Sequence, residues 1–253
     1  MIARFGLWKD RKYHLDRMSL RELVVAYFQY YAIQAYILVA LVSLGLAVHW
    51  MTAPVPVVIA GLAAVLIYPL VWYVLHRLVL HGQFLYRSPV TAAVWKRIHF
   101  DHHQDPHDLR VLFGALYTTL PTVALSTMPV GWLIAGPAGA ATGLGVGALV
   151  TCFYEFSHCI QHLSYKPKWG YLRRIKQRHM EHHFHNENGN FGITNFLWDH
   201  LLGTYYEKTE GARRSATVFN IGYTPEMARR YPWVAQLSGG VLTDNPRQRR
   251  QPS

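Results

Sequence analysis

Residues 23–50 read LVVAYFQYYAIQAYILVALVSLGLAVHW, and no Lys, Arg, Asp or Glu occurs from Leu23 to His76, a run of 54 residues. A second charge-free run of 44 residues extends from Val111 to Tyr154. A bilayer core needs about 20 apolar residues for each helical span, so each run is long enough for two spans and a turn. Turn signals lie near the middle of each run, at residues 52–56 (TAPVP), 128–131 (MPVG) and 136–137 (GP).

We therefore predict an all-α integral membrane protein with four transmembrane helices in two hairpins, at about residues 23–48, 56–76, 111–131 and 137–160. The composition agrees, because only 15% of the residues are charged, against about 25% in ordinary soluble domains. A large soluble helical core is the alternative, and it fits poorly because soluble core helices rarely lack charge over such lengths. The charged first 22 residues do not contain the apolar centre of a cleavable signal peptide.

Lysine and arginine residues outside the apolar runs predict the orientation of the chain. Six of them precede the first run, and more occur in residues 77–110 and 161–178, whereas the two hairpin turns contain none. We expect both termini and the segments that carry histidines to face the cytoplasm. The formal net charge of +11 then indicates a basic surface that lies on anionic lipid headgroups, and no accompanying motif indicates binding to nucleic acid.

Ten of the fifteen histidines fall into four tight boxes, each at a predicted cytoplasmic helix end or on a cytoplasmic segment. The boxes are HRLVLH (76–81), HFDHH (99–103), HCIQH (158–162) and HMEHH (179–183). Positions i, i+3 and i+4 of a helix share a face, so HFDHH and HMEHH are each expected to present three imidazoles together. Five positions of an ideal helix turn by about 140°, so His76 and His81 are expected either to reach two different metals or to flank a bent helix end.

Ten imidazoles are too many for one ion, because zinc takes about four ligands and octahedral iron about six. We therefore predict a dinuclear metal site with about five histidines for each ion. The predicted ligands are His76, His81, His99, His102, His103, His158, His162, His179, His182 and His183. Glu155 and Glu181 are either carboxylates that hold imidazole N–H groups or ordinary solvated or capping residues. His107, His185 and His200 lie close to the boxes in sequence but are not predicted to be ligands.

Three further features give weaker signals. Cys152 and Cys159 are predicted to be small buried apolar residues and not a disulfide or a thiolate site. Residues 136–150 contain five glycines, which either let helices pack closely or leave room for a lipid tail. Residues 186–195, rich in Asn and Gly, are predicted to fold back over the metals as a lid.

The four boxes and the segment FHNENGNFGITNFLWDHLLGT (184–204) resemble the membrane fatty acid hydroxylase superfamily, which includes sterol desaturases. Within it, the chain is most similar to fatty acid 2-hydroxylases, and the likeness covers about residues 68–206. The resemblance implies that the ten histidines hold two iron ions, with zinc as an alternative occupant in purified protein. The haem-binding HPGG motif of the cytochrome b5 domain that some members carry is missing here, which implies a separate electron donor, cytochrome b5-like or ferredoxin-like.

The domain organisation that we predict follows from these patterns. It consists of a basic cytoplasmic N-terminal segment (1–22), a membrane domain (23–160) that includes a histidine-bearing cytoplasmic segment (77–110), a cytoplasmic metal-binding cap (161–239) and a disordered tail (240–253).

The function that the resemblance implies is hydroxylation of the acyl chain of a fatty acid or lipid, at the 2-position, with O₂ and an external electron donor. An unactivated C–H bond resists acid–base attack, so a metal and O₂ have to supply the oxidant. The boxes do not separate hydroxylation from desaturation, and a sterol or isoprenoid oxidase or desaturase of the same superfamily stays open. A membrane metal transporter is a further alternative, although a transporter is expected to place its polar ligands near the bilayer midplane. A catalytically inactive scaffold that keeps the metals is a third.

Overall fold

The computed structural model describes residues 13–208 and 211–240. Within these residues the secondary structure is helical, apart from one isolated antiparallel bridge between His14 and Asp108, and the predicted all-α class is confirmed. Most of the predicted N-terminal segment and nearly all of the predicted tail lie outside the described residues. The chain divides into two compact units, whose described parts are residues 20–72 with 114–158 and residues 13–19, 73–113, 159–208 and 211–240.

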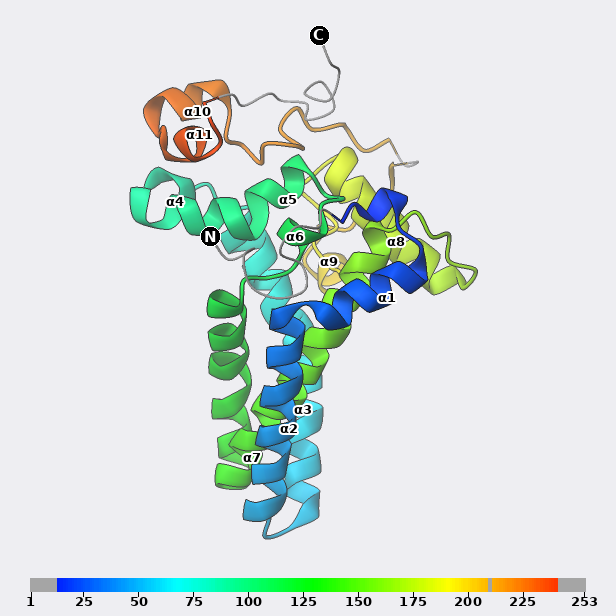
Figure 1. Ribbon diagram of the computed structural model, residues 1–253, viewed down its shortest axis with the longest axis vertical. Helices are drawn as coiled ribbons and strands as arrows, with labels where there is room; N and C mark the ends of the chain where they lie inside the picture. Colours follow the sequence, from blue (N-terminus) through cyan, green and yellow to red (C-terminus); the bar gives the residue numbers. More distant parts are fainter. Residues whose placement is uncertain (1–12, 209–210, 241–253) are drawn as a thin grey trace. The chain divides into compact units, whose positions relative to one another are not determined.

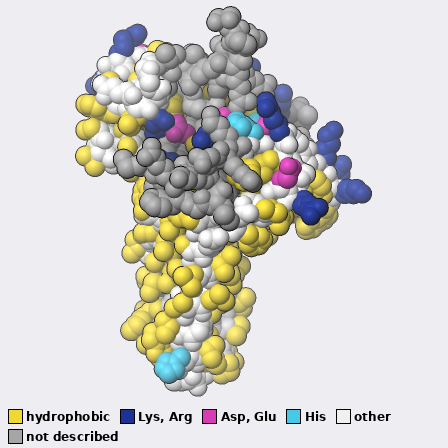
Figure 2. Space-filling view, viewed as in Figure 1, with side chains coloured by type: hydrophobic (Ala, Val, Ile, Leu, Met, Phe, Trp, Pro, Cys, Tyr) yellow, Lys and Arg dark blue, Asp and Glu magenta, His cyan; other side chains and the backbone are white. Residues whose placement is uncertain are grey.

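The first unit consists of α1 (Leu20–Gln29), α2 (Tyr31–Trp50) and most of α3 (Pro54–Val74) and α7 (Leu116–His162), as Figure 1 shows. Among the described residues, three helical segments are long and apolar enough to cross a bilayer, namely Tyr31–Trp50, Pro54–Arg87 and Leu109–His162. Figure 2 shows hydrophobic side chains over these helices, and leucines such as Leu66 and Leu133 are 74% and 84% exposed. Because an apolar surface of this extent does not face water in a soluble monomer, the chain is an integral membrane protein.

The first predicted span, at residues 23–48, is divided in the structure. α1 ends at Gln29 and α2 begins at Tyr31, because Tyr30 has an extended backbone (φ −78°, ψ 127°). The charge-free run continues across this break, so hydropathy gives no sign of it. The second span begins at Pro54, two residues before the predicted start, where proline suits the first turn of a helix.

α7 is two antiparallel helices separated by a sharp reversal. Ala135 (φ −143°, ψ 27°) and Gly136 (φ 56°, ψ −142°) interrupt the helical backbone, and glycine adopts such a positive φ without strain. The first of the two helices therefore continues past the predicted end at residue 131, with Pro129 inside it. Proline is tolerated within membrane helices because neighbouring groups satisfy the freed carbonyl.

The glycines of α7 bring its two halves into close contact. A Cβ on Gly139 would lie 2.0 Å from Gly131 O, and a Cβ on Gly143 would lie 2.6 Å from Thr127 O. These pairs are symmetric about Ala135, as expected for antiparallel helices. Close helix packing is therefore the role of these glycines, and the alternative of a slot for a lipid tail is wrong at Gly139 and Gly143.

The second unit packs short helices around an apolar core. Its α-helices are α4 (Pro89–Trp95), α5 (Asp101–Gln104), α6 (Leu109–Leu112), α8 (Gly170–Phe184), α9 (Leu197–Leu201), α10 (Pro225–Arg230) and α11 (Trp233–Leu237). Two π-helices, η3 (Leu75–Leu80) and η5 (Lys96–Phe100), and two 3₁₀-helices, η2 (Leu15–Arg17) and η4 (Leu85–Arg87), complete it. Trp95 and Tyr223 lie in the core, and Trp95 Nε1 donates to Leu80 O at 2.7 Å. This bond fixes α4 against the end of η3, which carries the first histidine box.

Candidate metal centre

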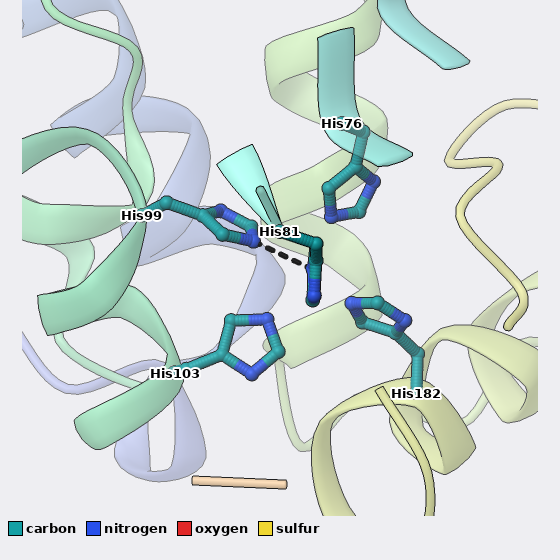
Figure 3. Close-up of side chains that lie close together, drawn as sticks. All are labelled: His76, His81, His99, His103 and His182. Carbon is teal, nitrogen blue, oxygen red and sulfur yellow. Dashed lines mark hydrogen bonds between the residues drawn. The ribbon is translucent and has the colours of Figure 1, made fainter. Parts of the chain in front are cut away.

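The histidines of the four boxes meet in two groups of five. Within each group one ring nitrogen from every member lies within 4.8 Å of the others, and nine of the ten side chains are buried. The first histidine group is His76, His81, His99, His103 and His182 (Figure 3), and the second histidine group is His102, His158, His162, His179 and His183. Each group offers enough nitrogen ligands to hold one metal ion.

A π-helix brings His76 and His81 into the same group. In η3 the backbone N–H of His81 donates to His76 O at 3.0 Å, which is the i to i+5 bond of a π-helix. The two residues therefore lie one turn apart, and their ring centroids are 5.0 Å apart. The expectation that this pair reaches two different metals is wrong, because the 140° separation holds only for an α-helix. Single π turns are frequent at functional sites.

The second and fourth boxes each contribute to both groups. His102 belongs to the second histidine group although the other two histidines of its box belong to the first, and His182 shows the reverse in the fourth box. Adjacent residues of a helix point about 100° apart, so the side chains of His102 and His103 point in different directions. The prediction that HFDHH and HMEHH each present three imidazoles together is wrong, because each of these boxes divides its histidines between the two groups.

Ring nitrogens inside each group face one another. His81 Nε2 lies 2.8 Å from His99 Nε2 in the first group (Figure 3), and His162 Nε2 lies 2.8 Å from His179 Nε2 in the second. Some buried ring nitrogens have no hydrogen-bond partner among the described residues, including His76 Nε2, His103 Nε2 and His183 Nδ1. An orphaned buried polar atom is costly, and a metal ion that accepts these lone pairs removes that cost. Imidazole donors without thiolate suit zinc, iron, copper and nickel.

Burial keeps the imidazoles in the neutral form that metal binding requires. It lowers the pKa of His103 to about 3. Burial, together with the charges of neighbouring histidines, also lowers the pKa of His99 and of His183 well below the usual range. A neutral imidazole has a free lone pair, whereas a protonated one has none. At neutral pH these side chains are therefore ready to act as ligands without the loss of a proton.

Backbone carbonyl oxygens orient several of the rings. The Nδ1–H groups of His76, His182 and His103 donate to Phe191 O, Gly189 O and Val218 O, at 2.7, 2.7 and 3.0 Å. Each bond leaves Nε2 as the atom that faces the group, which is how outer partners fix a ligand's tautomer. No residue type marks a carbonyl acceptor, so these three partners could not be predicted from the sequence.

The segment 186–195 folds back onto the first histidine group, in agreement with its predicted position. The Phe191 ring lies edge-on to His81, with centroids 5.2 Å apart. The carboxylate of Glu181 pairs with Arg178 at 2.6 Å, so the suggestion that it holds an imidazole N–H is wrong. Glu155 accepts a hydrogen bond from the backbone N–H of Gly114 at 3.1 Å.

Three histidines that were not predicted to be ligands lie outside both groups. His107 Nδ1 donates to His162 O at 3.0 Å, and His185 Nε2 donates to Ala212 O at 2.6 Å. His200 is exposed and stacks on Tyr205, with centroids 3.9 Å apart.

Residues 61–204 match the family model described as fatty acid hydroxylase, and these residues are more than half of the chain. The chain belongs to the fatty acid hydroxylase family. All ten histidines of the two groups lie inside the matched residues.

Several curated proteins are similar to this fatty acid hydroxylase family member. The ceramide very long chain fatty acid hydroxylase of Saccharomyces cerevisiae is 30% identical over 148 residues, which are 56% of this chain and 36% of the relative. A dihydroceramide fatty acyl 2-hydroxylase of Arabidopsis thaliana is 31% identical over 157 residues, or 60% and 62%. The fatty acid 2-hydroxylase of Rattus norvegicus is 30% identical over 148 residues, or 55% and 37%. The chain thus spans only 36% to 62% of the length of these relatives.

A solved structure gives the same likeness. It is described as full-length Scs7p with only the hydroxylase domain visible, and it is 25% identical with a TM-score of 0.62. The match covers 73% of this chain and 68% of that one.

Proposed function

We propose that the protein is a membrane monooxygenase that hydroxylates the acyl chain of a fatty acid or lipid at C2. The observation that supports this most directly is the convergence of ten histidines into two groups of five in a chain of the fatty acid hydroxylase family. The names of the relatives specify fatty acyl 2-hydroxylation, which supports oxidation at C2 in preference to desaturation or to oxidation of a sterol.

In this proposal each histidine group holds one iron ion, and the ten histidines of the two groups are the ligands. The iron pair supplies the O₂ chemistry that acid–base groups lack. The chain's own contribution is to keep the imidazoles neutral by burial, to orient His76, His103 and His182 through backbone carbonyls, and to exclude water from the buried groups.

The overall reaction replaces one C2–H bond of the acyl chain by C2–OH. One atom of O₂ enters the product and the other leaves as water, so the balance requires two electrons and two protons in addition to the substrate and O₂. We assign the electrons to a cytochrome b5-like or ferredoxin-like donor protein.

The proposed location is the cytoplasmic side of a membrane that the chain crosses four times. The spans are α2, α3 and the two halves of α7, since α7 has 47 residues and reverses at Gly136, and about 20 residues cross a bilayer. The termini and the histidine boxes then lie on the side rich in Lys and Arg. Exposed basic residues such as Lys168, Arg173 and Arg174 are placed on anionic lipid headgroups.

Lipid products formed under ¹⁸O₂ test the proposed function. The iron-loaded protein in lipid, with a reductant and an electron donor, is expected to yield 2-hydroxy acyl chains that carry one ¹⁸O atom. Mass spectrometry of the released acyl chains gives the position and the isotope content. A new double bond, an oxidised sterol or an ¹⁶O-only hydroxyl group would contradict the proposal.

A further inference from the structure

Asp199 is a fully buried carboxylate that binds the backbone of a nearby loop. It is 0% exposed. Its Oδ1 accepts hydrogen bonds from Phe191 N and Thr204 Oγ1, and its Oδ2 accepts one from Gly192 N, each at 2.8 Å. Hydrogen bonds to an ionised acceptor are roughly twice as strong as neutral ones, so this carboxylate fixes two consecutive peptide groups of the loop.

The loop 189–192 is the segment that orients two rings of the first histidine group. Its carbonyls at Phe191 and Gly189 accept the Nδ1–H groups of His76 and His182, both at 2.7 Å. Phe191 is thus bonded to Asp199 through its N–H and to His76 through its carbonyl oxygen. The carboxylate and the imidazole are separated by a single residue of backbone.

The backbone of this loop needs support from outside. Asn190 has a positive φ of 56°, a left-handed conformation that is uncommon for residues other than glycine. The fit around the carboxylate is also close, since a Cβ on Gly192 would lie 2.9 Å from Asp199 Oδ2 and 2.0 Å from Asn195 O. Without the carboxylate, the loop would lose the acceptor that its N–H groups share. The Phe191 carbonyl oxygen, which belongs to one of the two fixed peptide groups, would lose its fixed direction, and the neighbouring peptide group of Gly189 would keep only the bond from Asn190 N to Thr204 O.

We propose that Asp199 is a positioning residue for the first histidine group, which holds the loop 189–192 so that its carbonyl oxygens aim His76 and His182 at one metal ion. This inference rests on the proposed metal binding. Both loop carbonyls serve members of the first group, so the effect of Asp199 falls on one of the two ions. Substitution of outer partners of this kind typically lowers metal affinity by about 10–100-fold.

Cobalt titration of the full-length chain in detergent tests this role. The metal-free protein is titrated with Co²⁺, and the visible absorbance of the bound ion is followed. Wild type is expected to bind two ions. D199N replaces one acceptor oxygen by an NH₂ group that faces a backbone N–H, so the affinity of one site is expected to fall by about 10–100-fold while the other stays at the wild-type value.

A matched control separates this role from a general loss of stability. Asp108 is also a buried carboxylate, but it caps α6 and pairs with Arg110 at 2.6 Å. D108N is therefore expected to lower the stability of the fold and to leave both cobalt affinities unchanged. T204V removes one of the three hydrogen bonds to Asp199, so it is expected to give a smaller fall at the same site, and it serves if D199N does not fold.

The decisive result is whether D199N weakens one cobalt site or both. In the H76A/H182A background, where both rings that the loop aims are absent, D199N is expected to add no further loss of cobalt. Equal weakening of both sites by D199N or T204V, or no weakening, would overturn the positioning role. If wild type itself binds no cobalt, the proposed metal centre is wrong. If wild type and D199N both bind two ions with equal affinity, the metal centre stands and only the role of Asp199 is wrong.

Discussion

Each oriented histidine of the first group presents one ring nitrogen to the protein and the other to the group. In His76, His103 and His182 the Nδ1–H donates to a backbone carbonyl. This bond fixes the tautomer and the direction of the Nε2 lone pair. The directions of these three rings therefore depend on the carbonyl oxygens behind them as well as on the places of the histidines in the chain.

Replacement of His103 tests the assignment of ligands. H103A is expected to reduce the metal content of the purified protein from two ions to one, because the first group loses a nitrogen that has no hydrogen-bond partner among the described residues. H200A is the matched control, since His200 is exposed and stacks on Tyr205, and it is expected to keep both ions. Elemental analysis of both variants gives the counts. Two ions in H103A would show that this ligand assignment is wrong.

At the scale of single residues, the sequence predicts which imidazoles come together but not which groups orient their rings. Four boxes at ligand spacing identify ten residues that the structure brings together. The division between the two groups depends on which side of a helix each residue faces, and the spacing i, i+3, i+4 does not reveal it. Asp199 is one residue of the segment that carries the family resemblance, and only the folded loop shows that its carboxylate binds Phe191 and Gly192.

The π-helix η3 is the element on which the first group most depends. Insertion of one alanine after Val79 is expected to lengthen the spacing between His76 and His81 from five to six positions and to turn His81 by about 100° relative to His76. The first group then loses a ligand, and the metal content is expected to fall from two ions to one. V79A keeps the chain length and is expected to keep both ions. Circular dichroism checks that the helix content of both variants is unchanged, and two ions in the insertion variant would contradict the dependence of the first histidine group on the one-turn spacing of η3.

Close packing of the two halves of α7 gives a second prediction for an element. G139A places a Cβ where Gly131 O lies 2.0 Å away, so the helices must separate, at a cost of about 1–3 kcal/mol. G45A is the control, because a Cβ at Gly45 meets nothing within 4 Å and alanine favours the helix. Thermal unfolding in detergent is expected to show a lower Tm for G139A only. An equal Tm for both variants would contradict the packing role.

The helices themselves follow from the charge-free runs, whereas their ends do not. Both runs predict paired apolar helices, and the start of α3 at Pro54 lies two residues from the predicted position. The break at Tyr30 and the reversal at Gly136 occur inside uniformly apolar sequence. A backbone torsion sets each of them, and hydropathy does not respond to backbone torsions.

For the molecule as a whole, the proposed topology predicts that the hairpin turns and the histidine boxes face opposite sides of the membrane. In a C152S/C159S background, A53C in the first turn is expected to react with a membrane-impermeant thiol reagent on intact cells. N188C, at an exposed position of the second unit, is expected to react only after lysis. Mass-tag gel shifts report the labelling. Reaction of both cysteines on intact cells, or of N188C alone, would contradict the orientation.

In the proposed metal centre two ions lie in this protein, one in each histidine group. Anomalous diffraction at the iron edge, from crystals of the iron-loaded chain, locates the ions directly. We predict two peaks, one among His76, His81, His99, His103 and His182 and one among His102, His158, His162, His179 and His183. A single peak, or peaks away from these imidazoles, would contradict the account.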